Sequence, residues 1–245
     1  MWGAATRESL WCFSDAFVCR WHSAVSSDHY SLSGMYDQRV KDAIKFAVTA
    51  FVLAGGKSSR MGSDKAFLQL GDETLLSRAL LTAGAVAGEV RIVGNARKFA
   101  AFGEVIEDAY RGQGPLGGIH AALASSPTEL NLVLAVDLPF VGREFLQYLL
   151  LRARESVAMV TVPRAGGGLQ PLCAAYRRGF AEVAERSLRA GNNKIDSLFA
   201  TVQTCVIEED EFMRAGFSAE MFRNLNTPED LEKSEEFAFR IGKLG

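Results

Sequence analysis

Short apolar runs typical of buried strands alternate along the chain with segments that have helical spacing. We predict strands over 47–53, 89–93, 104–106, 130–136, 157–162, 172–176 and 201–207, and helices over 74–87, 97–102, 116–124, 143–154, 180–190 and 227–237. Asp72 is a candidate N-cap for the first of these helices. Such alternation favours a mainly parallel sheet with helices on both faces. The sequence therefore predicts an α/β fold: a three-layer, Rossmann-like α/β/α arrangement in a single domain.

Size, charge and cysteine spacing narrow the class of protein. The 245 residues, 48% of them hydrophobic, suffice for one substantial domain. A formal net charge of −2 gives no general positive field, which argues against nucleic acid as a partner. No apolar run has the length of a membrane span. The cysteines at positions 12, 19, 173 and 205 lack zinc-ligand spacing. We expect a cytoplasmic protein in which Cys173 and Cys205 are buried free thiols.

Residues 1–45 differ in character from the rest of the chain. They contain tryptophans at positions 2, 11 and 21 but show neither helical nor strand periodicity. They also lack the basic start and apolar core of a secretory signal. We expect an N-terminal extension that is disordered or precedes a natural start at Met35, and a functional domain over residues 46–240. A short interaction segment built on the tryptophans is the alternative.

The run 47–53 opens into a loop that is rich in glycine and in basic side chains, namely Gly55, Gly56, Lys57, Arg60, Gly62 and Lys65. Glycine lets backbone N–H groups approach a ligand closely, so a loop of this kind after a strand is suited to a polyphosphate. It is not a P-loop, because Gly62 is followed by Ser63 and Asp64 where that motif needs Lys and Ser or Thr. A solvated turn is the alternative, but the long apolar strand and the cations favour nucleotide binding.

Polar clusters follow several predicted strands, at 54–65, 94–95, 108–118 and 137–139. In sheets of this type, ligands bind beyond the carboxyl ends of the strands. Asp137 follows the run 130–136 and offers the hard oxygen that a divalent ion prefers, although an aspartate that starts the turn before Pro139 is the alternative. Lys65 and Arg60 would neutralise phosphates. Asn95 and Asp108 end successive strands and could contact the base and ribose of a nucleotide, but by residue type alone we interpret both as turn residues, because Asn and Asp favour turns.

Residues 112–117 also match the pattern Gly-x-Gly-x-x-Gly, with Asp137 farther along the chain. That combination is the fingerprint of a dinucleotide-binding fold. The strand before it is short and polar, and Pro115 removes an N–H group from the turn that would meet the pyrophosphate. The loop 54–65 would also be left without a role. Dinucleotide binding is therefore a minor alternative.

Several segments together resemble the molybdenum cofactor guanylyltransferases, which are nucleotidyltransferases with a GT-A-like fold. The segments are Leu53-Ala-Gly-Gly-x-Ser-x-Arg-Met-Gly-x-Asp-Lys65, Gly114-Pro-Leu-Gly-Gly118, Asp137-Leu-Pro-Phe140, Gln170-Pro171 and Asn224-Leu-Asn-Thr-Pro-Glu-Asp230. The first of them is long and restrictive. The resemblance covers roughly residues 47–232 and leaves the N-terminal extension uncovered.

This resemblance implies transfer of GMP from GTP to the molybdenum-molybdopterin cofactor, with release of pyrophosphate and with Mg2+ as cofactor. It implies catalytic roles for Arg60, Lys65 and Asp137, of which Asp137 is the metal ligand. The implied nucleotide and cofactor contacts come from Leu53, Ala54, Gly55, Gly56, Lys65, Asn95, Asp108, Gly114, Pro115, Leu116, Asp137 and Asn226. Asn95 and Asp108 match guanosine-contacting positions, Gly114–Gly117 a wall of the purine pocket, and Asn226 and Gln170-Pro171 the pterin side.

The expected partners are GTP, the molybdenum-molybdopterin substrate, other cofactor-biosynthesis proteins and acceptor molybdoenzymes, with neither nucleic acid nor a membrane among them. Alternatives from two classes stay open. One is an enzyme of the same fold that uses CTP or acts on a sugar phosphate. The other is a non-catalytic, nucleotide-binding scaffold, since fold alone does not fix function.

Overall fold

A computed structural model describes residue 45 and residues 47–55, 64–110 and 112–225. All of these belong to the structural unit Tyr36–Gly245. The N-terminal extension, Gly56, Arg60, Asn226 and the predicted helix 227–237 lie outside the described residues. The domain boundaries at residues 46 and 240 therefore stay predictions.

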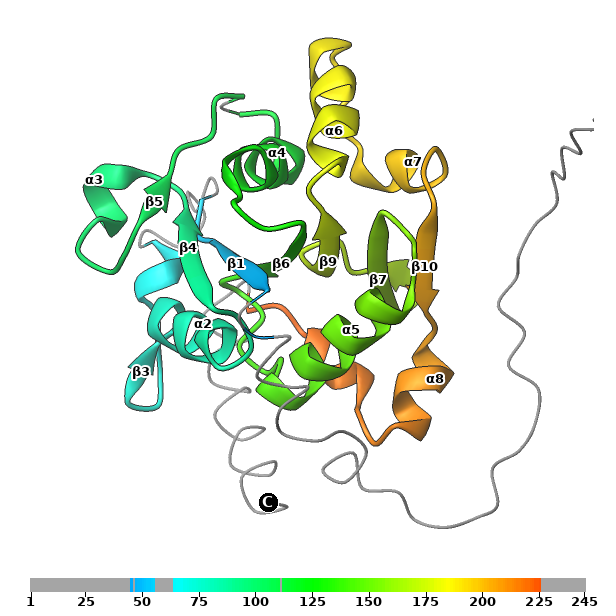
Figure 1. Cartoon of the computed structure of the whole chain (residues 1–245). Coiled ribbons are helices and arrows are strands. Elements are labelled where there is room, and N and C mark those ends of the chain that lie inside the picture. Colours follow the sequence, from blue (N-terminus) through cyan, green and yellow to red (C-terminus); the bar gives the residue numbers. More distant parts are fainter. Residues whose placement is uncertain (1–44, 46, 56–63, 111, 226–245) are drawn as a thin grey trace, which may run out of the picture. The chain divides into compact units, whose positions relative to one another are not determined.

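The main sheet has the strand order β10-β7-β9-β6-β1-β4-β5, and β8 pairs with β7 beside this path (Figure 1). Its strands are β1 (Val48–Leu53), β4 (Glu89–Val93), β5 (Val105–Ile106), β6 (Leu130–Ala135), β7 (Val160–Ala165), β8 (Gly168–Leu169), β9 (Cys173–Arg177) and β10 (Thr204–Ile207). β1 pairs in parallel with β4 and β6, whereas β9 runs antiparallel to both β6 and β7. The sheet is mainly parallel, as predicted.

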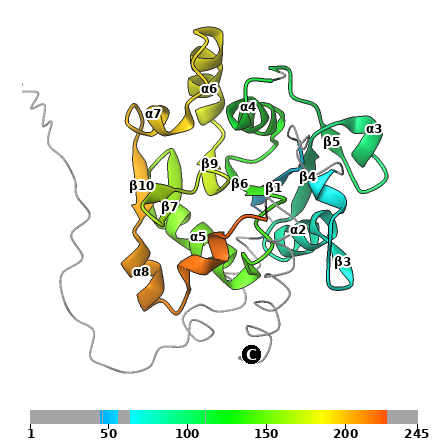
Figure 2. The same ribbon diagram turned by 180° about the vertical axis from the view of Figure 1, so that it is seen from behind.

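Helices cover both faces of the sheet (Figures 1 and 2). One face carries α2 (Leu75–Gly84), α5 (Arg143–Glu155) and α8 (Glu209–Arg214), and the other carries α4 (Pro115–Ser125), α6 (Phe180–Arg189) and α7 (Ile195–Phe199). Side chains alternate along a strand, so Ala50 and Val52 of β1 enter the first core while Phe51 and Leu53 enter the second. The predicted α/β/α layering is confirmed.

Short elements that the periodicity did not predict connect the longer ones. They are the 3₁₀ helix η2 (Lys65–Phe67), the hairpin β2 (Gln69–Leu70) and β3 (Glu73–Thr74), β8, α7, α8 and the 3₁₀ helix η3 (Ala219–Phe222). Each has six residues or fewer, which is too short for an apolar period to be visible. The short helix α3 (Ala96–Phe99) forms close to its predicted place.

Some predicted boundaries are wrong. Asp72 does not cap α2; the Thr74 hydroxyl accepts a hydrogen bond from the Ser77 N–H at 3.1 Å, because the hairpin delays the start of the helix. Residues 157–159 and 201–203 precede β7 and β10 instead of forming part of them. None of the helices in the described ranges combines the length and apolar character that a membrane span requires.

Candidate nucleotide site

Backbone hydrogen bonds hold the carboxyl ends of neighbouring strands β6, β1, β4 and β5 together. The Val136 N–H donates to the Leu53 carbonyl at 3.1 Å, and the Gly94 N–H donates to the Ile106 carbonyl at 3.0 Å. Between them, the Ala54 N–H donates to the Val93 carbonyl at 3.0 Å. The predicted residues that follow these strands therefore lie along one edge of the sheet.

A lysine and an aspartate meet at this edge. Asp137 comes just after β6, and Lys65 is the first residue of η2. The Lys65 Nζ lies 3.6 Å from the Asp137 Oδ2, and the two side chains are 21% and 25% exposed. A half-buried pair of this kind offers an ammonium for phosphate and a carboxylate for a cation within one small volume.

Asp137 also anchors the end of the described chain. Its backbone carbonyl accepts a hydrogen bond from the Leu225 N–H at 3.2 Å, and Leu225 is buried. This bond brings the start of the segment 224–230 to the strand end that carries Asp137. Asn226 comes next in sequence and lies outside the described residues.

The donor set fits a divalent ion that arrives with a nucleotide. Within the described ranges there is no group of three or more His, Cys, Asp or Glu side chains that could hold an ion by itself. Magnesium is commonly bound by one or two carboxylates, with phosphate oxygens and water completing its shell. A single carboxylate at Asp137, beside a cation that attracts phosphate, matches that requirement.

Asp108 lies between the end of β5 and the first turn of α4. Its Oδ1 accepts a hydrogen bond from the Tyr110 N–H at 2.7 Å. A Cβ atom added at Gly117 would lie 2.5 Å from its Oδ2, so the carboxylate occupies space that only glycine leaves. Gly118 similarly lets α4 approach β1, because a Cβ there would lie 3.2 Å from a methyl group of Leu53. Gly117 and Gly118, from the segment predicted to form a wall of the purine pocket, therefore also allow close packing of α4.

Asn95 caps α3. Its Oδ1 accepts a hydrogen bond from the Arg97 N–H at 2.9 Å, and the residue is exposed. An asparagine just before a helix is a recognised capping signal, and the sequence interpretation missed it. The cap uses the amide oxygen and leaves the amide NH2 group out of this hydrogen bond.

Three of the predicted contacts, at Ala54, Gly55 and Leu116, are limited by this geometry. The N–H groups of Ala54 and Gly55 both donate to the Val93 carbonyl, at 3.0 and 3.2 Å, so in this structure they bond within the sheet. Leu116, in the first turn of α4, is fully buried in the core, whereas Gly114 and Pro115 are exposed. Leu53 and Ala54 are also buried. Side-chain contact between Leu116 and a ligand would therefore need α4 to move.

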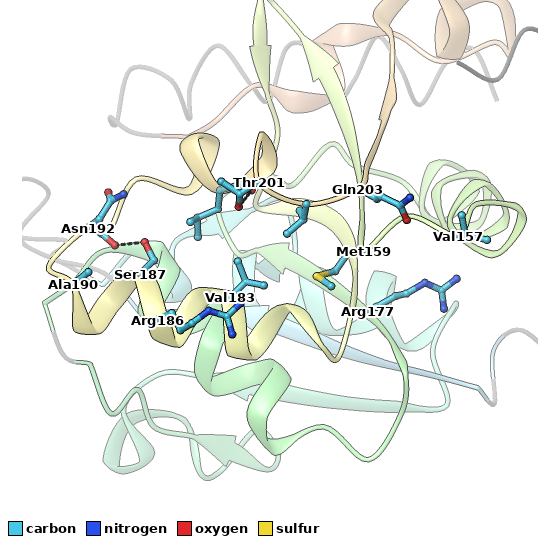
Figure 3. A pocket seen from close by; sticks show the side chains of 12 residues that line it. Val157, Met159, Arg177, Val183, Arg186, Ser187, Ala190, Asn192, Thr201 and Gln203 are labelled. Atoms are coloured by element: carbon cyan, nitrogen blue, oxygen red, sulfur yellow. Dashed lines mark hydrogen bonds between the residues drawn. The ribbon is translucent and has the colours of Figure 1, made fainter. Parts of the chain in front are cut away.

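A shallow groove of about 750 Å³ lies elsewhere on the molecule (Figure 3). Residues of α6, such as Val183 and Arg186, form one wall, and Met159 and Gln203 form the other. Met159 and Gln203 precede β7 and β10, so the groove lies at the amino ends of these strands, on the edge opposite Asp137. Its Arg177 already donates to the carbonyls of Ala158 and Ser156. The groove is therefore separate from the candidate nucleotide site.

The two described cysteines differ. Cys173 is fully buried in β9, where burial raises the pKa of its thiol, so it is a structural residue and not a nucleophile. Cys205 in β10 is free but only partly buried. The prediction of two buried thiols is therefore correct for Cys173 and wrong for Cys205, because β10 lies at the edge of the sheet.

A mainly parallel sheet that presents Lys65 and Asp137 at its carboxyl edge is compatible with a nucleotide-binding protein of the α/β class. Residues 50–205 match the family described as the MobA-like NTP transferase domain. The chain belongs to this family.

Similar proteins agree with this assignment. A protein of Pelotomaculum thermopropionicum named "Probable molybdenum cofactor guanylyltransferase" is 36% identical over 78% of this chain and 93% of its own length. A "Molybdenum cofactor guanylyltransferase" of Syntrophotalea carbinolica is 32% identical over 76% of this chain and 89% of its own. The crystal structure of molybdopterin-guanine dinucleotide biosynthesis protein A from Archaeoglobus fulgidus superposes with a TM-score of 0.70, at 27% identity, over 78% of this chain and 99% of that one.

Proposed function

We propose that this protein transfers GMP from GTP to the molybdenum-molybdopterin cofactor, forming the guanine dinucleotide cofactor and pyrophosphate. The observation that carries the proposal is the Lys65–Asp137 pair, 3.6 Å apart at the carboxyl edge of the sheet. The names of the relatives that are 36% and 32% identical supply the acceptor and the base. A cytoplasmic location, other biosynthetic proteins and acceptor molybdoenzymes stay predictions.

The reaction needs no protein nucleophile. A terminal phosphate oxygen of the pterin attacks the α-phosphorus of GTP, the bond from that phosphorus to the bridging oxygen breaks, and pyrophosphate leaves. Positioning and charge neutralisation carry this chemistry. Asp137 would hold Mg2+, which when bound neutralises phosphate charge, and Lys65 would balance charge on the same phosphates. Arg60, outside the described residues, has the same predicted task.

Base selection is proposed to involve Asp108 and Asn95. A carboxylate can accept hydrogen bonds from the guanine N1–H and N2 amine, whereas adenine offers no donor at N1. The carboxylate of Asp108 is already oriented by the Tyr110 N–H and by the space at Gly117. The same carboxylate could instead bind a ribose hydroxyl, which would carry no information about the base.

A nucleotide panel tests this proposal. Wild-type protein with Mg2+ and molybdenum-loaded molybdopterin should release pyrophosphate with GTP in preference to ATP and CTP. Asp108→Ala should weaken GTP binding about tenfold, the lower end expected for losing a hydrogen bond to a charged group, and should leave ATP binding nearly unchanged. Equal loss for all three nucleotides would assign Asp108 to the ribose or to local structure.

The same panel separates the alternatives. Preference for CTP, or turnover with a sugar phosphate as acceptor, would move the protein to another activity of the same fold. Tight GTP binding without pyrophosphate release would identify a scaffold. Release with GTP only when the pterin is present supports the guanylyltransferase.

We further propose that the functional domain begins near residue 46. A chain that starts at Met35 should keep the activity of the full chain and melt within about 2 °C of it, since less than about 1 kcal/mol of packing would be lost. Thermal unfolding and pyrophosphate release of both chains check this. A drop of several degrees would show that residues 1–34 pack against the domain.

A further inference from the structure

A second ion pair involves Asp64, the residue that precedes Lys65 in sequence. The Lys98 Nζ is 2.8 Å from the Asp64 Oδ2. The Asp64 side chain is only 18% exposed, whereas that of Lys98 is 55% exposed. Lys98 is on α3 and Asp64 immediately precedes η2, so the pair joins two elements that are distant in sequence.

Asp64 fixes the turn that carries Lys65. Its Oδ1 accepts a hydrogen bond from the Ala66 N–H at 3.3 Å, and its carbonyl accepts one from the Phe67 N–H at 3.0 Å. The Lys65 carbonyl in turn accepts from the Leu68 N–H at 3.1 Å. One carboxylate therefore caps η2 with one oxygen and binds Lys98 with the other.

The helix α3, which carries Lys98, is held in place by hydrogen bonds and by a buried aromatic ring. Its first turn is held by Asn95 and by Glu107, whose Oε1 accepts from the Ala96 N–H at 3.1 Å. Its Phe99 is buried, and the ring leaves no room for a side chain at Gly94. Phe67 of η2 packs its ring against Phe99, with the centroids 5.7 Å apart. A polar and an aromatic contact thus hold η2 against α3.

We infer that Lys98 is a positioning residue that, through Asp64 and η2, holds the Lys65 ammonium at Asp137. An exposed ion pair contributes little to stability by itself. Catalysis is more sensitive than stability, because a displacement of about 1 Å of a charged group can lower a rate by two orders of magnitude. The expected effect on the rate of GMP transfer rests on the proposed function. The expected effect on the turn η2, which carries Lys65, rests on the structure alone.

The kinetic test removes the charge of Lys98 and keeps its stem. Lys98→Met should lower kcat about five- to tenfold with little change in KM for GTP, and Lys98→Arg should restore most of the rate. The control is Arg97→Met, which removes the same charge from the adjacent, exposed position of α3. If Lys98 acted only by attracting nucleotide, both Met variants would raise KM and leave kcat unchanged, which would overturn the inference.

A double-mutant cycle tests whether Lys98 affects the rate through Lys65. If Lys98 acts through Lys65, the variant with both Lys65→Met and Lys98→Met should be no slower than Lys65→Met alone. Rate losses that multiply would show that Lys98 acts elsewhere, and would contradict the inference.

Amide hydrogen exchange gives a readout that does not need activity. In the nucleotide-free protein, Lys98→Met should speed exchange of the Ala66, Phe67 and Leu68 amides about threefold to fivefold, and Arg97→Met should not. Unchanged exchange in Lys98→Met, or faster exchange with a wild-type kcat, would overturn the inference. If the wild-type protein transfers no GMP, the proposed function fails, and the exchange comparison alone decides whether Lys98 holds the turn.

Discussion

Replacing Asp137 with alanine should lower turnover at least about 1,000-fold while leaving the fold intact. Loss of a metal ligand removes about 4 kcal/mol of transition-state stabilisation, and each 1.36 kcal/mol changes a rate tenfold. The fold should persist because the side chain is a quarter exposed and its backbone carbonyl, which bonds to Leu225, is unchanged. Pyrophosphate release under saturating GTP and Mg2+ is the measurement.

Asp72→Ala is the matched control, because it removes an exposed aspartate from the turn between β2 and β3. It should turn over at the wild-type rate. In Asp137→Ala, GTP binding without metal should be as tight as in the wild type or tighter, since a negative charge that repels phosphate is gone. Near wild-type turnover of Asp137→Ala would remove this carboxylate from the mechanism.

Replacing Gly94 with alanine should destabilise the protein by about 2 kcal/mol, roughly a 30-fold change in the unfolding equilibrium constant. A Cβ atom at this position would lie 2.8 and 2.9 Å from two ring atoms of Phe99. Phe99 is 1% exposed and packs in the core, so its ring has no free space to enter. Thermal unfolding should show a Tm lower by about 4–8 °C.

Gly84→Ala provides the comparison for this substitution. A Cβ atom there would meet only a Val90 methyl group at 3.8 Å, which is an ordinary contact. Gly84 is the last residue of α2, where alanine favours the helix, so this variant should be as stable as the wild type or slightly more stable. If Gly94→Ala unfolded at the same temperature as Gly84→Ala, the Phe99 ring would have to be more mobile than its burial indicates.

The long elements were predictable because their periodicity is strong. β4 has its predicted bounds, and α5 and α6 differ from theirs by a residue at one end. Turn chemistry was harder to predict. Asp72 and Thr74 are both residues that cap helices, and the sequence does not show that a hairpin carries the chain past Asp72. The apolar run Cys173–Tyr176 also does not indicate that β9 is antiparallel to its neighbours.

The gathering of the candidate nucleotide-site residues at one edge of the sheet was predictable, because parallel strands bring their carboxyl ends together. It was not predictable which backbone N–H groups at this edge bond within the protein and are thereby taken from a ligand. The sequence offers Ala54 and Gly55 as donors to a phosphate, and only the structure shows that Val93 accepts from both. By contrast, Asn95 and Asp108 each bond to a backbone N–H two residues ahead, as expected of turn residues, and this role is compatible with ligand binding but independent of it.

The antiparallel strand β9 has a consequence for how the chain folds during synthesis. β5, β4, β1 and β6 all lie within residues 48–135, so this half of the sheet can assemble while the rest is still being translated. Until β9 emerges, β6 is an edge strand with unpaired backbone groups, which is a site for aggregation. β7 and β9 pair with each other and can add to that edge as one hairpin. Delaying the emergence of residues 136–177 from the ribosome should therefore reduce the yield of soluble protein more than delaying the emergence of the residues after 177.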